Sequence, residues 1–368
     1  FHGETLMTTL FDPINLGGKQ LKNRIIMAPL TRGRAGADGV PDELMAEYYR
    51  QRASAGLIIA EATAISAGGR GWMNSPGIYN DAQQAGWQQV TDAVHSAGGT
   101  IFMQLWHMGA AVHPDFIGGE TPVSSSAVKL TGQLTTPKGR DRHFVTPREL
   151  TVDEIAEQVS SFSSAAARAV NAGADGVEIH AANGFLIDQF NRDSSNRRTD
   201  AYGGNINNRL RFMMEVVEAV CQEIGADKVG IRLSPTNKVW GISDSNYRDT
   251  FGRAVEQLNR FGLAYLHLLE PQPDSGHGME TIDYLTPLLR QKYDGVLLAN
   301  GGYNNDTGEA ALTEGKADAI TFGVPFIANP DLVERYQSGA ALSEPDSAHF
   351  YTEGAAGYID YQPMQSNV

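Results

Sequence analysis

The chain has a single cysteine and lacks any long apolar run. Cys221 stands alone among 368 residues, so an intrachain disulfide and a cysteine metal site are both excluded. We interpret it as a small buried apolar residue of a helix. No apolar stretch approaches the roughly 20 residues that cross a bilayer, and residues 1–9 lack the basic start and apolar centre of a signal peptide. We therefore expect a cytoplasmic protein.

Basic residues are also scarce. The chain has 29 lysines and arginines against 43 aspartates and glutamates, which gives a net charge of −14. Such an acidic chain repels nucleic acid and anionic membrane surfaces, so we expect neither as a partner. The expected partner is a small-molecule substrate, and both a monomer and a homodimer remain open.

Short apolar runs alternate with amphipathic stretches along the whole chain. The runs are continuous in Val, Ile, Leu and Ala, which is typical of parallel strands buried on both faces. They are Arg24–Pro29, Leu57–Thr63, Thr100–Trp106, Gly176–Ala181, Lys228–Ser234, Tyr265–Glu270, Gly295–Gly302 and Ala319–Phe326. The expected helices include Asp42–Ala55, Ala82–Ala97, Val152–Ala172, Asn207–Glu223, Asn246–Phe261 and Thr307–Lys316. Eight such units predict an α/β protein, a (β/α)8 TIM barrel.

An open doubly wound sheet is the alternative fold. It usually has a Gly-x-Gly-x-x-Gly turn after its first strand, whereas this chain has Ala28-Pro29-Leu30-Thr31 there. We interpret residues 1–7 as a probable tag and 8–368 as one barrel domain. Residues 107–150, with a β-like segment around 143–145, are too long for a plain connection, so we expect an excursion that caps the strand ends after the third strand.

Polar residues and glycines collect where the predicted strands end, which is where barrels of this type place their active sites. They are Pro29, Leu30, Thr31, Glu61, Ala62, Thr63, Gln104, Trp106, His180, Asn183, Arg232, Gly301, Gly302, Gly323 and Val324. This set donates hydrogen bonds but contains almost no acid. His107 and His113 flank the third strand without a matching third ligand, so we expect no metal.

Gln104, Arg232 and backbone amides suit a planar ring that carries several acceptors, such as a flavin isoalloxazine. Glycines after the seventh and eighth strands suit a phosphate. His180 and Asn183 lie three residues apart just past the fourth strand. Two donors that converge on one carbonyl oxygen would make the β-carbon of a conjugated alkene accept hydride.

Several segments resemble the Old Yellow Enzyme family of FMN-dependent ene reductases. They include LFDPINLGGKQLKNRIIMAPLTRGRA from Leu10, IFMQLWHMG from Ile101, DGVEIHAANGFLIDQF from Asp175, FGVPFIANPDLVERY from Phe322 and FYTEGAAGYIDY from Phe350. The resemblance extends over essentially the whole chain after Met7. It implies a (β/α)8 barrel with bound FMN, with NADPH or NADH as the reductant.

The resemblance also implies a role for each matching position. The flavin ring would be lined by Pro29, Leu30, Thr31, Ala62, Gln104 and Arg232, with Thr31 near O4 and Arg232 near N1 and O2. The ribityl phosphate would meet the backbone of Gly301, Gly302 and Gly323. The substrate oxygen would be held by His180 and Asn183, and the substrate side would be lined by Trp72, Trp106 and Tyr351.

Three positions depart from the family pattern. Phe185 stands where the family has the tyrosine that protonates the α-carbon, Val324 where it has the arginine that grips the phosphate, and Ala110 where it has arginine after LWHMG. Loss of a positioned acid typically costs about 10²–10⁴-fold in rate. Loss of a charge-assisted contact should weaken FMN binding about tenfold or more.

The main hypothesis is therefore an oxidoreductase that acts on an α,β-unsaturated carbonyl or nitro compound. Hydride would pass from flavin N5 to the β-carbon while His180 and Asn183 stabilise the substrate oxygen. Because Phe185 cannot donate a proton, reduction could give way to reductive cyclisation or isomerisation. The alternative is a non-redox isomerase or cyclase on the same barrel, with weak or no flavin binding.

Overall fold

The computed structural model describes residues 8–271 and 284–364, and its centre is a closed barrel of eight parallel strands. The predicted fold class is therefore confirmed. The strands, in order around the barrel, are β3 (Ile25–Met27), β4 (Leu57–Ala64), β5 (Ile101–Trp106), β10 (Gly176–His180), β11 (Val229–Leu233), β12 (Tyr265–Leu269), β13 (Leu297–Asn300) and β14 (Ala319–Phe322). The segments 1–7, interpreted above as a tag, 272–283 and 365–368 lie outside the described residues.

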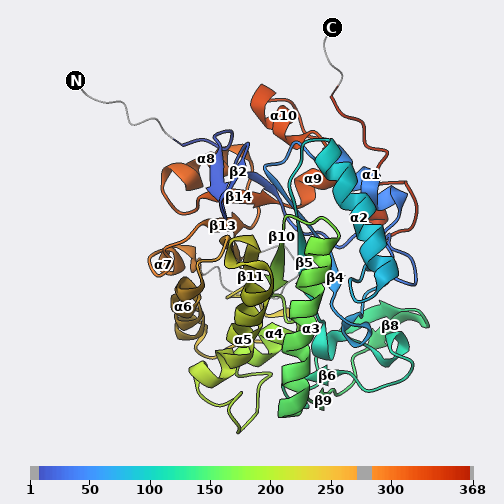
Figure 1. Cartoon of the computed structure of the whole chain (residues 1–368), viewed down its shortest axis with the longest axis vertical. Helices are drawn as coiled ribbons and strands as arrows, with labels where there is room; N and C mark the ends of the chain where they lie inside the picture. The colour runs from blue at the N-terminus through green and yellow to red at the C-terminus, as the bar shows by residue number, and fades with distance from the viewer. Residues whose placement is uncertain (1–7, 272–283, 365–368) are drawn as a thin grey trace.

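Helices surround the strands, as Figure 1 shows for α2, α3, α5 and α6. The main helices that follow the first seven barrel strands are α1 (Glu43–Gln51), α2 (Asp81–Ser96), α3 (Val152–Asn171), α5 (Ile206–Ile224), α6 (Tyr247–Leu258), α7 (Thr286–Arg290) and α8 (Asn305–Thr313). Helix α3 begins with a capping box, in which Thr151 Oγ1 accepts from the Glu154 amide and the Glu154 carboxylate accepts from the Thr151 amide. No helix of the described residues is long and apolar enough to span a membrane.

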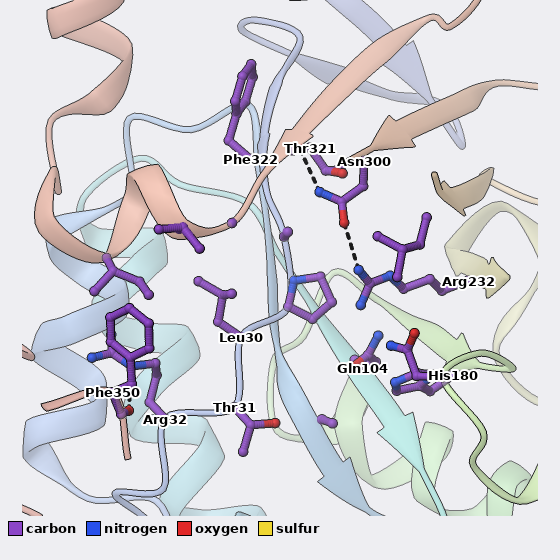
Figure 2. Close-up of a pocket in the computed structure, with 18 of the residues that line it drawn as sticks. Leu30, Thr31, Arg32, Gln104, His180, Arg232, Asn300, Thr321, Phe322 and Phe350 are labelled. Carbon is purple, nitrogen blue, oxygen red and sulfur yellow. Dashed lines mark hydrogen bonds between the residues drawn. The ribbon is translucent and has the colours of Figure 1, made fainter. Parts of the chain in front are cut away.

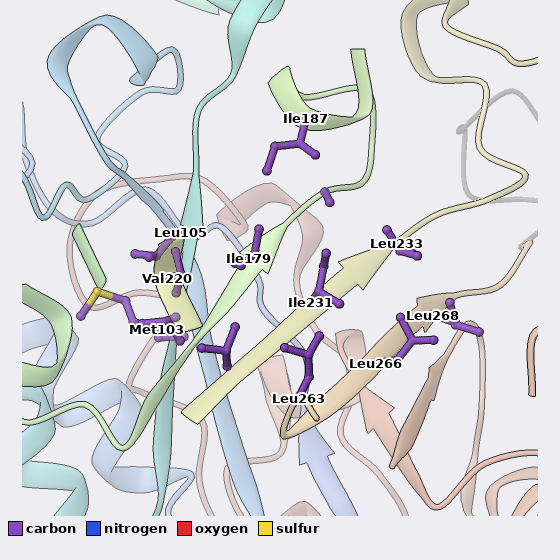
Figure 3. Close-up of a cluster of buried hydrophobic side chains, with 14 of the residues drawn as sticks. Met103, Leu105, Ile179, Ile187, Val220, Ile231, Leu233, Leu263, Leu266 and Leu268 are labelled. Carbon is purple, nitrogen blue, oxygen red and sulfur yellow. The ribbon is translucent and has the colours of Figure 1, made fainter. Parts of the chain in front are cut away.

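Side chains of the central strands alternate between two environments. Ile179, Ile231 and Leu266 belong to the apolar cluster between strands and helices (Figure 3). Their chain neighbours Glu178, Arg232 and His267 are buried polar residues, and successive side chains of a strand point to opposite faces. The strands are thus apolar toward the helices and carry polar groups inside the barrel.

A hairpin that the sequence analysis did not predict packs at the amino ends of the barrel strands. It consists of β1 (Ile14–Leu16) and β2 (Lys19–Leu21), joined by Gly17 and Gly18. Both glycines have positive φ, 56° and 77°, as two-residue hairpin turns require. Ile14, Leu16 and Leu21 join a buried cluster with inward residues of the strands, so the hairpin closes this end of the barrel.

Two local predictions were wrong. The last strand ends at Phe322 and not at Phe326, because the chain turns at Gly323 into helix α9 (Val324–Ala328), whose Pro325 has no N–H for a ladder. The segment around 143–145 is not the centre of a strand: the hairpin is β7 (Gln133–Thr136) with β8 (Gly139–His143).

The remaining elements lie in the excursions and near the end of the chain. They are β6 (Val123–Ser124), β9 (Arg148–Glu149), α4 (Leu186–Asn191) and α10 (Leu332–Ser338). Leu130 and Phe144 of the long excursion join a buried cluster with Trp106 and Phe185. This excursion therefore packs beside the carboxyl ends of the barrel strands.

Candidate active site

A cavity of about 570 Å³ opens at the carboxyl ends of the barrel strands. Every site residue predicted from the sequence lines it except Glu61, Thr63 and Gly301. The predicted residues that the structure brings together there are Pro29, Leu30, Thr31, Ala62, Trp72, Gln104, Trp106, His180, Asn183, Phe185, Arg232, Gly302, Gly323, Val324 and Tyr351. The cavity is also lined by residues that were not predicted from the sequence, including Arg32, Trp240, Asn300, Tyr303 and Phe350.

Arg232 is held in place by a residue of another strand end. Its Nη2 donates to Asn300 Oδ1 at 2.8 Å, and Asn300 Nδ2 donates to the Thr321 carbonyl at 2.9 Å (Figure 2). The buried Arg232 Nε has no hydrogen-bond partner among the described residues. Asn300 is the polar residue that ends the apolar strand β13, so the criterion that found Gln104 would have found it too.

A chain of buried polar groups runs across the barrel beneath the cavity. Gln104 Nε2 donates to Glu178 Oε1 at 2.7 Å, Glu178 Oε2 lies 2.8 Å from His267 Nδ1, and His267 Nε2 lies 2.9 Å from Thr321 Oγ1. Burial acts to raise the pKa of Glu178, but His267 and Arg232 outweigh it and hold the pKa below its ordinary value. Burial lowers the pKa of His267, so a neutral imidazole donates from Nδ1 to an ionised carboxylate.

Because this pair is fully buried, Glu178→Ala is expected to destabilise the fold. Removing the carboxylate leaves the His267 N–H and the Gln104 amide without their acceptor, and each buried donor left unsatisfied costs about 1–3 kcal/mol. Denaturant unfolding followed by circular dichroism measures the loss. Glu178→Gln is the matched control, since its amide oxygen can still accept from one partner and its loss should be smaller. Equal stability of the two variants would contradict this account.

His180 and Asn183 lie where β10 gives way to the next loop. Asn183 has φ of 57°, a left-handed conformation that asparagine tolerates, and its N–H donates to Ser234 Oγ at 2.8 Å. Asn237 Nδ2 donates to Asn183 Oδ1 at 2.7 Å, so the Nδ2 of Asn183 is the group left for a ligand. Asn237 was not predicted, because it follows β11 and reaches Asn183 only through the tertiary fold.

His180 is neutral in this site. Burial first, and then the charge of Arg232, hold its pKa well below the ordinary value of histidine. Its buried Nδ1 has no hydrogen-bond partner among residues 8–271 and 284–364. A neutral imidazole beside a free amide can donate to one ligand oxygen without carrying a charge.

Phe185 sits within an aromatic wall of the cavity and is 8% exposed. Its ring meets Trp106 edge-on at 4.7 Å between centroids, His180 at 4.9 Å and Trp240 at 5.7 Å. Trp240 has a positive φ of 53°, which is unusual for a residue other than glycine. This wall is apolar where the resemblance would place a hydroxyl.

The other two departures lie in different surroundings. Val324 is 51% exposed at the mouth of the cavity. Ala110 is buried, and its N–H donates to Gln189 Oε1 at 3.0 Å. Trp72 and Tyr351, which also line the cavity, pack edge-on at 5.4 Å between ring centroids, and Tyr351 is 58% exposed.

The polar groups of the cavity fit a flavin ring. Since Gln104 Nε2 is used by Glu178, its Oε1 can accept from a ring N–H, while Arg232 offers donors to carbonyl oxygens. Beside them lie buried polar atoms that have no partner among the described residues, Arg232 Nε, His180 Nδ1 and Trp106 Nε1. Buried polar groups of this kind call for a polar ligand.

No group of His, Cys, Asp and Glu side chains in the described part of the chain is arranged to hold a metal. His107 is instead a buried structural residue, whose Nδ1 accepts from the Gly109 N–H at 3.0 Å. Burial lowers its pKa from 6.5 to about 4.

The free energy of unfolding is therefore expected to fall as pH drops from 6.5 to about 4. In this range His107 binds a proton in the unfolded chain but not in the folded protein. Its contribution to stability is therefore complete above pH 6.5, the pKa of the unfolded state, and is lost as the pH falls to about 4, the pKa of the folded state. Urea unfolding at a series of pH values measures the slope. His107→Gln should reduce it, whereas replacing the exposed His143 should not; an unchanged slope in His107→Gln would refute the assignment.

Comparison with known proteins extends over nearly the whole chain. Residues 9–343 match the model of the NADH:flavin oxidoreductase / NADH oxidase family. The structure of an Old Yellow Enzyme homologue from Zymomonas mobilis is 46% identical, with a TM-score of 0.94 over 96% of this chain and 99% of that one. Morphinone reductase in complex with tetrahydroNAD is 46% identical, with a TM-score of 0.92 over 97% and 98%.

A further relative is described as a probable flavin mononucleotide-dependent alkene reductase of Leishmania infantum. It is 41% identical over 96% of this chain and 97% of its own length. The predicted cofactor FMN, with NADH or NADPH as reductant, is confirmed at the level of the family. The chain belongs to the NADH:flavin oxidoreductase / NADH oxidase family and is an oxidoreductase related to the Old Yellow Enzymes.

Proposed function

We propose that this protein is an ene reductase for α,β-unsaturated carbonyl or nitro compounds in which water supplies the second hydrogen. The observation that carries the proposal is the hydrogen bond of Asn237 to Asn183, because it presents the Asn183 amide as a donor beside the neutral His180. FMN held by Gln104, Arg232 and the loops after β13 and β14 would, once reduced by NADPH or NADH, supply the hydride that the β-carbon of the substrate accepts.

His180 and Asn183 would stabilise the charge that develops on the substrate oxygen. Donors that are already oriented cost no reorganisation during the reaction, which is why such contacts contribute much of the rate. Asn183 is fixed on both sides, by Ser234 at its backbone and by Asn237 at its side chain. Trp72, Trp106 and Tyr351 would surround the carbon skeleton of the substrate.

Phe185 would determine how the α-carbon of the substrate is protonated after hydride transfer. Its ring lies among Trp106, His180 and Trp240 and offers no proton. The substrate enolate would therefore persist until water reaches it. Within that time an electrophilic group of the same substrate could capture the enolate, which would give reductive cyclisation. Alternatively, rotation about the bond between the α- and β-carbons, followed by return of the hydride to the flavin, could give isomerisation.

The proposal is tested with the purified protein loaded with FMN under anaerobic conditions. NADPH should bleach the flavin spectrum, and a cyclic enone or a nitroalkene should restore it with formation of the saturated product. In heavy water the deuterium at the α-carbon should enter from either face, because no fixed donor directs it. A bleached protein that no conjugated carbonyl or nitro compound reoxidises would contradict the proposal.

A further inference from the structure

One end of the cavity is formed by the loops that follow the last two barrel strands. Barrels of this type frequently bind a phosphate between these two loops. Here the loops run through Gly301, Gly302 and Tyr303 after β13, and through Gly323 and Val324 after β14. If FMN binds as proposed above, its phosphate would lie at this end, and Arg232 would lie at the ring.

Neither loop carries a cation. All lysines and arginines of the sequence fall within residues 8–271 and 284–364, because the three remaining segments contain none. Among these described residues, the cavity is lined by two cations, Arg32 and Arg232. The guanidinium of Arg232 is bound to Asn300.

Arg32 is committed to the protein itself. Its Nε donates to the Phe350 carbonyl at 3.0 Å, its Nη2 to the Gly357 carbonyl at 2.7 Å and its Nη1 to the Tyr48 hydroxyl at 3.2 Å. Figure 2 shows its side chain beside Phe350. Arg32 is 1% exposed and its guanidinium is bonded to the C-terminal segment, so it is not free to bind a ligand in the cavity.

The charged side chain beside the glycine turn is negative. The Tyr303 hydroxyl donates to Glu270 Oε2, and a Cβ placed on Gly301 would lie 3.0 Å from Glu270 Cβ. Val324 on the facing loop is apolar and half exposed. What these loops offer a ligand is main-chain N–H groups, which are neutral donors and bind a hydroxyl oxygen as well as a phosphate oxygen.

We infer that this site makes little use of the charge of a phosphate, so that riboflavin binds almost as tightly as FMN. The inference rests on the proposed flavin site and concerns its selectivity. This end of the cavity has no cation and has the Glu270 carboxylate nearby. A phosphate dianion is therefore expected to bind there with little more free energy than a neutral hydroxyl. At the exposed mouth it would remain largely hydrated.

Competition between the two flavins tests this directly. The full-length protein is equilibrated with equimolar FMN and riboflavin, and the flavin that it retains is identified by chromatography. We expect the ratio of bound FMN to riboflavin to stay within about tenfold and to change little with salt. A preference for FMN above about a hundredfold would overturn the inference while leaving the proposed function intact. Retention of neither flavin would overturn both.

Val324→Arg supplies the missing charge, and Val324→Gln is its matched control. Because Val324 is half exposed, both side chains can be accommodated without disturbing the core. The arginine should raise the preference for FMN about tenfold, and this gain should fade with salt. Glutamine should leave the ratio unchanged. If arginine also leaves the ratio unchanged, the phosphate does not lie at this loop and the inference fails.

Discussion

Replacing Phe185 with tyrosine is expected to accelerate turnover and to make protonation of the α-carbon stereospecific. The ring of residue 185 lines the cavity and is held edge-on by Trp106 and His180. A tyrosine in the same orientation would place its hydroxyl toward the space that the substrate fills. A positioned general acid contributes about 10²–10⁴-fold to a step that proton transfer limits.

Two measurements separate this effect from a change in binding. The rate of the oxidative half-reaction with a cyclic enone should rise in Phe185→Tyr, while the rate of reduction by NADPH should stay unchanged. In heavy water the deuterium should enter the product from one face in the variant and from both faces in the original protein. Phe185→Leu is the control, because it alters the ring contacts without adding a hydroxyl. A tyrosine variant with the same rate and the same deuterium distribution would show that residue 185 does not face the α-carbon.

The barrel could be predicted from the sequence because its signals are local. Each strand is a short apolar run, and each long helix is bounded by a cap or a glycine, as with Thr151 at the start of α3 and Gly173 beyond its end. Site residues such as Gln104, His180 and Arg232 were found because they are polar residues at or near the carboxyl ends of apolar strands. Because barrels of this type have their active sites at the carboxyl ends of the strands, these residues could be predicted to form one site.

The groups that support those residues were missed because they depend on register. Glu178 and His267 lie within apolar runs, and only the strand register across the barrel brings them to Gln104 and Thr321. Arg32 and Phe350 are separated by most of the chain, so their contact follows from the return of the C-terminal segment. Asn237 belongs to the same class, since its contact joins the loops after β10 and β11.

Removing either donor to the substrate oxygen is expected to produce the other large effect. His180→Ala and Asn183→Ala should each lower kcat by about 10²–10³-fold, which is typical for the loss of one donor to a developing oxyanion. The flavin spectrum and reduction by NADPH should change much less, because the ring contacts of Gln104 and Arg232 remain.

Two further variants decide whether orientation and neutrality matter. His180→Asn keeps an uncharged donor and should retain more activity than His180→Ala, with a flat rate profile from about pH 6 to 8, since the imidazole it replaces is already neutral there. Asn237→Ala leaves Asn183 in place but frees its amide to rotate, so kcat should fall while the overall fold is retained. Loss of an oxyanion donor costs far more than tenfold in kcat. If His180→Ala and Asn183→Ala both keep more than about a tenth of the original kcat, the substrate oxygen is therefore held by other groups. Of the two cations that line the cavity, Arg232 would then be the group to test, because Arg32 is bonded to the C-terminal segment.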